Sequence, residues 1–321
     1  MNISPELSSA AMIAVRDCMG AVAGEKVLIV TDEPMRTLGY SLWRAAKEIG
    51  AEAMLVEMLP RKTNGEEPPR EIAELMKMVD VVLCPTSKSL THTDSRRAAS
   101  EKGVRVATLP GVTEEIMIRC MNADYHKIAE RTFRLCDELE KTSVVRVEAP
   151  GGTKVTLPIK GRKAHASSGL FREKGLWGNL PTGEAYLAPV EGESQGVVVV
   201  DGSMAGVGMV REPIKIVVKD GYATDITGGA EAKRLIELLE PHGKDARTVA
   251  EFGIGTNDKA TLTGLIIEDE KVIGTIHIAF GDNKSMGGSV RVASHLDGLI
   301  KQPTVWFDDR KVMETGKLLI V

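Results

Sequence analysis

Short apolar runs alternate with helix-like segments along the first 142 residues of the chain, and this alternation limits the possible folds more than any other feature. The apolar runs with the length of strands are Lys26–Val30, Glu52–Met58, Val79–Cys84 and Val104–Leu109. The segments with helical spacing of apolar residues are Ser4–Val22, Thr37–Ile49, Pro69–Met78, Ser95–Lys102, Thr113–Met121 and Asp124–Glu140. Strands that alternate with helices in this way favour an open, mostly parallel sheet covered by helices.

From Ser143 onward the pattern changes to short, β-rich segments separated by glycines. The strand-like segments are Val144–Glu148, Thr153–Pro158, Gly196–Val200 and Ile214–Lys219, and the one clear helix is Gly228–Leu239. We therefore predict an α/β protein with two domains. Residues 1–142 form an open, mostly parallel α/β domain, and residues 143–321 form a β-rich α+β domain.

The loop after the first strand argues against a nucleotide site in the first domain. It reads Thr31-Asp32-Glu33-Pro34, whereas a dinucleotide-binding loop needs glycines there so that the backbone approaches the pyrophosphate. We expect this domain to act as a scaffold or to cover a substrate.

Composition excludes several classes of partner. The chain has 41 Lys and Arg against 45 Asp and Glu, a net charge of −4, and only 4% aromatic residues. Nucleic acids and anionic membranes select clustered basic residues, so we expect neither as a partner. The N-terminus has no basic segment followed by an apolar run, and Cys18, Cys84, Cys120 and Cys136 are scattered. We expect a cytoplasmic protein with free, buried thiols.

Four segments of the second domain carry residues suited to chemistry. They are Leu180–Glu184, Ala250–Asn257, Gly274–Gly281 and Ser294–Gly298, which contain Glu184, Glu251, His277, and His295 with Asp297. In a strand, alternate residues face the same side, so His295 and Asp297 share a face. His277 shares its face with small neighbours, which leaves room around the imidazole.

Each of these residues has an ordinary structural explanation when taken alone. A single strand histidine is commonly a hydrogen-bonded core residue, and an aspartate before glycine is commonly a turn residue. Together, three acids and two histidines lie in glycine-rich or apolar surroundings, where uncompensated charge is costly. A divalent cation would offset that cost, and mixed carboxylate and imidazole donors favour Zn, Mn, Co or Fe over Ca. The second domain is therefore predicted to bind metal.

These segments resemble the aminopeptidase T and aminopeptidase S type of metallopeptidases. The resemblance covers most of the second domain, and its most specific part is the string Glu-Asp-Glu-Lys-Val-x-Gly-Thr-Ile-His-Ile-Ala-Phe-Gly, which begins at Glu268. It implies an N-terminal α/β domain joined to a C-terminal domain with a two-metal site. The ligands that it implies are Glu184, Glu251, His277, His295 and Asp297.

The resemblance implies a metal-dependent aminopeptidase that removes N-terminal residues from peptides. Two divalent ions, Zn, Co or Mn, would activate a bridging water and polarise the scissile carbonyl. Glu251 suits a bridging, catalytic role, and Glu184 would bind one metal or hold the α-ammonium group of the substrate. We expect no organic cofactor, a peptide or small-molecule substrate, and a homodimer that completes the cleft.

Two departures from that family keep other functions open. The stretch Asp282–Gly287 lacks the tyrosine that the family usually has there, and the stretch between His277 and His295 is shortened. One alternative is a non-haem Fe(II) ring-cleaving dioxygenase, similar to the dihydroxypyridine dioxygenases that resemble the same peptidases, with His277, His295 and Asp297 as facial triad. The other is a non-catalytic protein that metal stabilises.

Overall fold

The structure, a computed structural model, describes residues 3–320 and forms two compact units. The first unit contains the chain up to Lys127 together with Gly169–Thr182, and the second contains Ile128–Ser168 together with the chain from Gly183 onward. The expected boundary of independent domains between residues 142 and 143 stays a prediction.

The first unit is built around a five-stranded parallel sheet with the order β2-β1-β3-β4-β8. Its strands are β1 (Lys26–Asp32), β2 (Glu52–Met58), β3 (Val81–Cys84), β4 (Arg105–Thr108) and β8 (Trp177–Asn179). Its helices are α1 (Pro5–Met12), η1 (Ile13–Cys18), η2 (Glu33–Met35), α2 (Arg36–Glu48), α3 (Arg70–Met76), α4 (Asp94–Glu101) and α5 (Glu114–Met121). The predicted parallel α/β architecture is confirmed.

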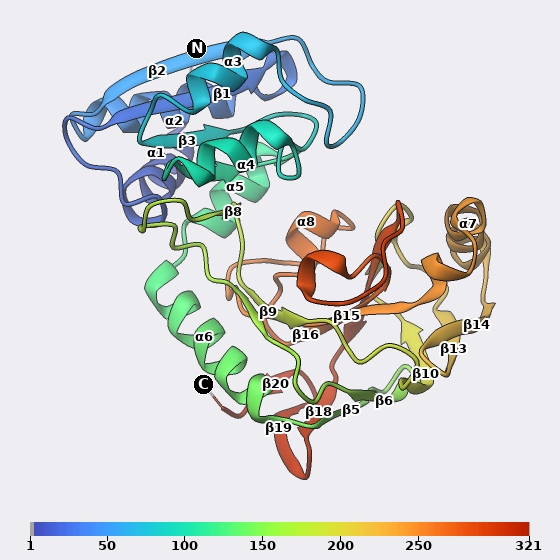
Figure 1. The fold of residues 1–321 in the computed structure, drawn as a ribbon. Helices are drawn as coiled ribbons and strands as arrows, with labels where there is room; N and C mark the ends of the chain where they lie inside the picture. Colours follow the sequence, from blue (N-terminus) through green and yellow to red (C-terminus); the bar gives the residue numbers. More distant parts are fainter. Residues whose placement is uncertain (1–2, 321) are drawn as a thin grey trace. The chain divides into compact units, whose positions relative to one another are not determined.

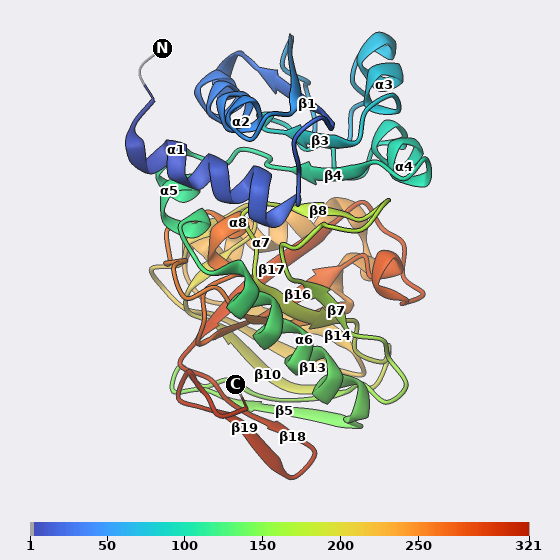
Figure 2. The ribbon, with the colours of Figure 1, turned by 90° about the vertical axis from the view of Figure 1, so that its left-hand side faces the viewer.

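Helices cover both faces of this sheet. Figure 2 shows α1 and α2 on one side of the strands and α3 and α4 on the other. Leu28 and Val30 of β1 pack in one core cluster with Ile72 of α3. Val27 and Ile29, which alternate with them and so face the other side of the sheet, are also fully buried. Burial on both faces explains why these strands appear in the sequence as continuous apolar runs. The short β8 was not predicted, because three residues carry no periodic signal.

The second unit contains two antiparallel sheets. One has the order β14-β13-β10-β6-β5-β18-β19-β20, and the other has the order β12-β11-β17-β16-β15-β9-β7. The strands of the first sheet are β5 (Val144–Glu148), β6 (Lys154–Pro158), β10 (Gln195–Val200), β13 (Ile214–Lys219), β14 (Tyr222–Thr227), β18 (Thr304–Phe307), β19 (Arg310–Glu314) and β20 (Lys317–Leu318). Those of the second are β7 (His165–Ser167), β9 (Glu184–Leu187), β11 (Ser203–Met204), β12 (Gly208–Met209), β15 (Val249–Gly255), β16 (Thr275–Gly281) and β17 (His295–Lys301).

One hydrophobic core joins the two antiparallel sheets and their helices. It takes in Leu135 of α6 and Leu235 of α7 beside apolar residues of both sheets. The helical elements are α6 (Tyr125–Lys141), α7 (Ala230–Leu239), η3 (Glu240–His242), η4 (Lys244–Arg247), α8 (Ile266–Asp269) and η5 (Lys284–Met286). Figure 1 shows α7 beside β13 and β14, at one end of the eight-stranded sheet.

Strand alternation gives the seven-stranded sheet one apolar face and one polar face. Phe252 and Ile254 of β15, with Ile276 and Ile278 of β16, belong to the core. Residues at the alternate positions therefore project from the opposite face. His277 is one of them, so its polar side chain lies on the face opposite the apolar core. It is nevertheless fully buried.

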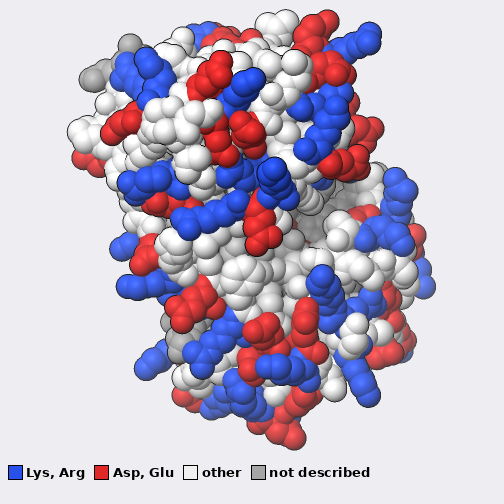
Figure 3. Space-filling view, turned by 60° about the vertical axis from the view of Figure 1, so that its left-hand side comes forward, with Lys and Arg blue, Asp and Glu red and all other residues white. Residues whose placement is uncertain are grey.

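Three further features bear on the composition. Cys18, Cys84, Cys120 and Cys136 are all free and buried, as the sequence predicts. Between residues 3 and 320, no helix has the length and apolar character needed to cross a membrane. Figure 3 shows basic and acidic side chains interspersed on the face that it draws.

Candidate metal centre

The five residues expected to bind metal come from four neighbouring strands of the seven-stranded sheet. Glu184 begins β9, Glu251 lies in β15, His277 lies in β16, and His295 and Asp297 lie in β17. The pairing of β15, β16 and β17 places Glu251 and Asp297 on either side of Ala279, in one row across the strands. Residues separated by more than 100 positions therefore meet on one face, although their roles as ligands or catalytic groups stay predictions.

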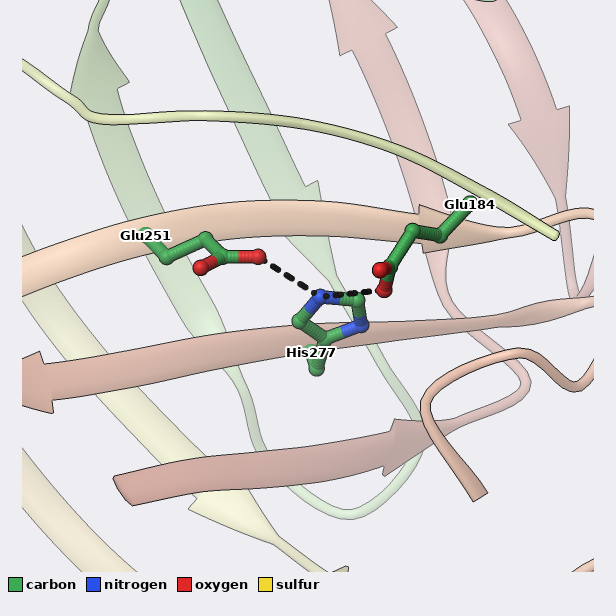
Figure 4. Close-up of side chains that lie close together, drawn as sticks. All are labelled: Glu184, Glu251 and His277. Carbon is green, nitrogen blue, oxygen red and sulfur yellow. Dashed lines mark hydrogen bonds and ion pairs between the residues drawn. The ribbon is translucent and has the colours of Figure 1, made fainter. Parts of the chain in front are cut away.

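His277 lies between two carboxylates. Its Nε2 is 3.1 Å from Oε1 of Glu251 and 3.5 Å from Oε2 of Glu184. Figure 4 shows both carboxylates directed at this ring nitrogen. The other ring nitrogen, Nδ1, is buried and has no hydrogen-bond partner.

The His295 side of the centre is better oriented and more accessible. Nε2 of His295 is 3.2 Å from Oε2 of Glu251 and 3.5 Å from Oδ1 of Asp297. Its Nδ1 is 2.7 Å from the carbonyl oxygen of Asp282, which only accepts, so Nδ1 carries the proton and donates. Nε2 is then left free for a metal, the arrangement that ligating histidines usually show. The His295 side chain is 30% exposed.

A glycine makes room for the buried imidazole. Gly253 pairs with His277 across β15 and β16. A Cβ atom on Gly253 would lie only 2.0 Å from Nε2 of His277. The ring therefore lies against the bare backbone of the neighbouring strand, where only glycine fits.

The carboxylates and imidazoles at the centre stabilise one another's charged forms. Burial works against charge on Glu251, yet hydrogen bonds from His277 and His295 hold the pKa of Glu251 well below its ordinary value. Burial also works against charge on His277, and the hydrogen bond to Glu251 nevertheless raises the pKa of His277 to about 9. The pKa of His295 is raised as well, against burial, chiefly by Asp297. Without metal, protons on the imidazoles compensate the carboxylates, and a bound cation would replace those protons.

Two residues at the centre, Glu270 and Lys271, were not singled out from the sequence. The ammonium group of Lys271 lies 2.5 Å from Oε1 of Glu184 and 2.5 Å from Oε1 of Glu270. Burial lowers the pKa of Lys271, but the carboxylates of Glu184 and Glu270 raise it by more, so that its pKa lies above the ordinary value. Burial raises the pKa of Glu270 to about 8. Both residues follow two further acids, and such a run is typical of a solvated face, which hid the signal.

The two acids before Glu270 hold the adjoining loop. Glu268 accepts a hydrogen bond of 2.9 Å from the backbone N–H of Thr261. Asp269 accepts bonds from the backbone N–H groups of Thr263, at 2.7 Å, and Gly264, at 2.8 Å. Both acids are fully buried, so they have a structural role beside the centre.

Aromatic side chains adjoin the centre on the β9 side. Tyr186 lies two residues after Glu184, on the same face, and pairs with Gly253 across the sheet. Burial, followed by Glu184 and Glu251, raises the pKa of Tyr186. Its ring stacks on His165 with the centroids 5.4 Å apart. The alternation of Glu184 and Tyr186 is the sequence signal that would have identified the tyrosine.

A cavity of about 510 Å³ opens beside His165. It is lined by Lys160, Gly161, Arg162, Lys163, His165, Val190, Met286 and Gly287. Lys284 and Ser285, which lie where the related peptidases usually have a tyrosine, are exposed on η5.

The donor set fits a divalent ion. Three groups have ligand atoms within 4.8 Å of one another: Glu184, Glu251 and His277; Glu251, His295 and Asp297; and Glu270, His277 and Asp297. Each contains one imidazole and two carboxylates, a mixture that suits Fe, Mn, Co or Zn. Among residues 3–320, none of these three groups contains both His277 and His295. Buried imidazoles and carboxylates that converge on one sheet face are typical of a metal-dependent enzyme.

Comparison with known protein families identifies the family to which this chain belongs. A family model described as 2,5-dihydroxypyridine 5,6-dioxygenase matches residues 13–320. The chain belongs to this family. A 2,5-dihydroxypyridine 5,6-dioxygenase of Pseudomonas putida strain KT2440 is 22% identical over 243 residues, which is 72% of this chain and 69% of the relative.

Two solved structures have the same fold. A 2,5-dihydroxypyridine dioxygenase from Pseudomonas putida KT2440 matches with a TM-score of 0.86 and 18% identity, over 100% of this chain and 99% of that one. Wild-type AmpT from Thermus thermophilus matches with a TM-score of 0.72 and 17% identity, over 98% of this chain and 99% of that one. At such low sequence identity, these two matches show only that the fold is shared.

The expected aminopeptidase activity, and with it the hydrolase class, is wrong. The matching family and the curated relative are ring-cleaving dioxygenases, and the better of these two structural matches is also a dioxygenase. The fold resemblance to aminopeptidase T is correct. The error has a physical cause, because the motifs that carried the resemblance build the sheet and its polar face, and the two solved structures share this fold. The expected homodimer and the expected cytoplasmic location stay predictions.

Proposed function

We propose that this chain is a ring-cleaving dioxygenase that uses a non-haem Fe(II) ion to open a hydroxylated aromatic ring. The family match over residues 13–320 supports the reaction class. The curated relative is named for 2,5-dihydroxypyridine, and a dihydroxylated nitrogen heterocycle is therefore the first substrate to test.

The observation that carries the proposal is the group formed by Glu251, His295 and Asp297. Their ligand atoms lie within 4.8 Å of one another. The His295 side chain is 30% exposed, and we propose that a substrate hydroxyl group and dioxygen approach the group from this side. We propose that one iron ion binds here, in place of the expected pair of ions and of the expected facial triad with His277.

The surrounding residues orient this donor set. His277 bonds Oε1 of Glu251 and so leaves Oε2 directed toward His295. The carbonyl of Asp282 holds the His295 ring in the tautomer that presents Nε2. A bound ferrous ion would supply the electrons that activate dioxygen. Two carboxylates would neutralise its charge inside a buried site, which favours retention of the ion.

Oxygen consumption by iron-loaded protein tests this function. The metal-free protein is reconstituted anaerobically with Fe(II), and oxygen uptake and loss of ring absorbance are followed with 2,5-dihydroxypyridine and other dihydroxylated aromatic rings. We expect uptake that requires both iron and substrate. Asp297→Asn should abolish it, because the variant loses a charged ligand, whereas Asp225→Asn, at an exposed position of β14, should leave it unchanged. Iron-loaded protein that opens none of these rings would refute the proposal.

A further inference from the structure

We infer that the ammonium group of Lys271 takes the place of a second divalent cation and limits the centre to one metal ion. The inference deepens the proposed function, since it specifies how the same site selects its metal content. Lys271 acts here as a positioning residue that holds two carboxylates.

The backbone fixes Lys271 against the sheet. Its carbonyl oxygen accepts a hydrogen bond of 2.9 Å from the N–H of Asn257, just beyond β15. Val272, the next residue, forms a bridge with Asn257. A Cβ atom on Gly255 would lie 2.2 Å from the carbonyl oxygen of Val272, so the two backbones touch. The lysine is thus placed by its main chain and not only by its ion pairs.

The side chain then delivers a fixed positive charge into the polar face. Only 5% of the Lys271 side chain is exposed, against 9% for Glu184 and 16% for Glu270. The ammonium group binds one oxygen of each carboxylate. The other oxygen of Glu184, Oε2, faces Nε2 of His277.

These contacts remove the donors that a second ion needs. Of the three candidate groups, one depends on Glu184 and another on Glu270, and Lys271 binds both residues. Only the group of Glu251, His295 and Asp297 is independent of Lys271. A second divalent ion on Glu184 would lie a few ångströms from the ammonium group, and like charges at that distance repel strongly in a buried site. One ion and one lysine therefore share the carboxylates.

Metal stoichiometry tests the inference without any turnover. Metal-free protein is dialysed against rising concentrations of Zn(II), which has no redox chemistry, and bound metal per chain is measured. Wild type should bind one ion. Lys271→Met, which keeps the length of the side chain but removes its charge, should bind two, with the second at least about a hundredfold tighter than in wild type. Lys271→Arg keeps the charge and should bind one, as should the exposed control Lys301→Met.

A double variant shows where the added ion binds. Lys271→Met combined with Glu184→Gln should return to one ion, because the second site loses a carboxylate ligand. The inference is overturned if wild type binds two ions, or if folded Lys271→Met still binds one. Should Lys271→Met fail to fold, the wild-type and Lys271→Arg stoichiometries decide, and two ions in either would refute the inference. Absence of oxygenase activity would count against the proposed function alone, since zinc binding does not depend on it.

Discussion

Replacing Gly253 with alanine should disturb the centre with a single methyl group. The new carbon would lie 2.0 Å from Nε2 and 2.2 Å from Cε1 of His277, whereas nonbonded heavy atoms settle at about 3.5–4.0 Å. The ring must therefore retreat by about 1.5 Å, which breaks its contact with Glu251. Gly253 lies outside the left-handed region of backbone conformation, so the effect comes from the clash and not from backbone strain.

The magnitude follows from two contributions. Overpacking of a tight site costs about 1–3 kcal/mol, and the lower chain entropy of unfolded alanine returns about 0.4–1 kcal/mol. We expect the free energy of unfolding of the metal-free protein to fall by about 1–2 kcal/mol in urea titrations. We also expect metal affinity to fall about 10–100-fold, the usual effect of disturbing a residue that orients a ligand.

A second glycine provides the control for this experiment. A Cβ atom on Gly151 would meet the side-chain carboxylate of Asp201 at 3.2 Å, and such a neighbour moves aside easily. Gly151→Ala should therefore leave both the unfolding free energy and the metal affinity near the wild-type values. If Gly253→Ala behaves like Gly151→Ala in calorimetric metal titrations, the placement of the His277 ring against β15 is wrong.

Three further outcomes are expected. Protonated His277, whose pKa is raised, stabilises the metal-free protein fully below the ordinary pKa of 6.5, and this contribution is lost as the pH rises through about 9. Ionised Glu251, whose pKa is lowered, stabilises it above the ordinary pKa of 4.5, and this contribution is lost in acid. Urea titrations should therefore place maximum stability between pH 4.5 and 6.5, and a steady rise in stability toward pH 9 would contradict this. Asp269→Ala should lower the free energy of unfolding by about 3 kcal/mol in the same assay, because two backbone N–H groups lose a charged acceptor, whereas Asp258→Ala, which breaks an ion pair 3.6 Å long with Arg131, should cost under about 1 kcal/mol. Removing metal with EDTA should lower the Tm, by an amount that corresponds to about 2.7 kcal/mol when the ion had been present at a hundred times its Kd; an unchanged Tm would exclude a bound stabilising ion.

The sequence indicates the elements well and their partners poorly. Strand β16 is visible because His277 sits in an alternating run that ends in glycine, and β1 is visible because it is apolar throughout. The pairing of Gly255 with Glu184 could not be predicted from the sequence, because it joins distant segments whose register depends on the folded sheet. Lys271 was missed because it directly follows the three acids Glu268–Glu270, and a charged run of this kind is typical of a solvated face.

The candidate site shows the same division between local and distant information. His295 and Asp297 could be paired from their spacing alone, but the place of Glu251 between two imidazoles depends on three neighbouring strands. The reaction class was misjudged because the segments that carried the resemblance belong to a fold that AmpT and the dioxygenase share. The missing tyrosine in Asp282–Gly287 was the local feature that pointed toward the dioxygenase.

The late entry of β8 into the parallel sheet has a consequence for synthesis on the ribosome. Trp177–Asn179 pairs with β4, but the chain must first produce Ile128–Ser168, which belongs to the second unit. Until then, the N–H and C=O groups along one edge of β4 have no strand to bind, and such an edge invites pairing with another nascent chain. A ribosome that stalls shortly after residue 142 would leave this edge open, so the yield of native protein should depend on the speed of translation through the following forty or so codons.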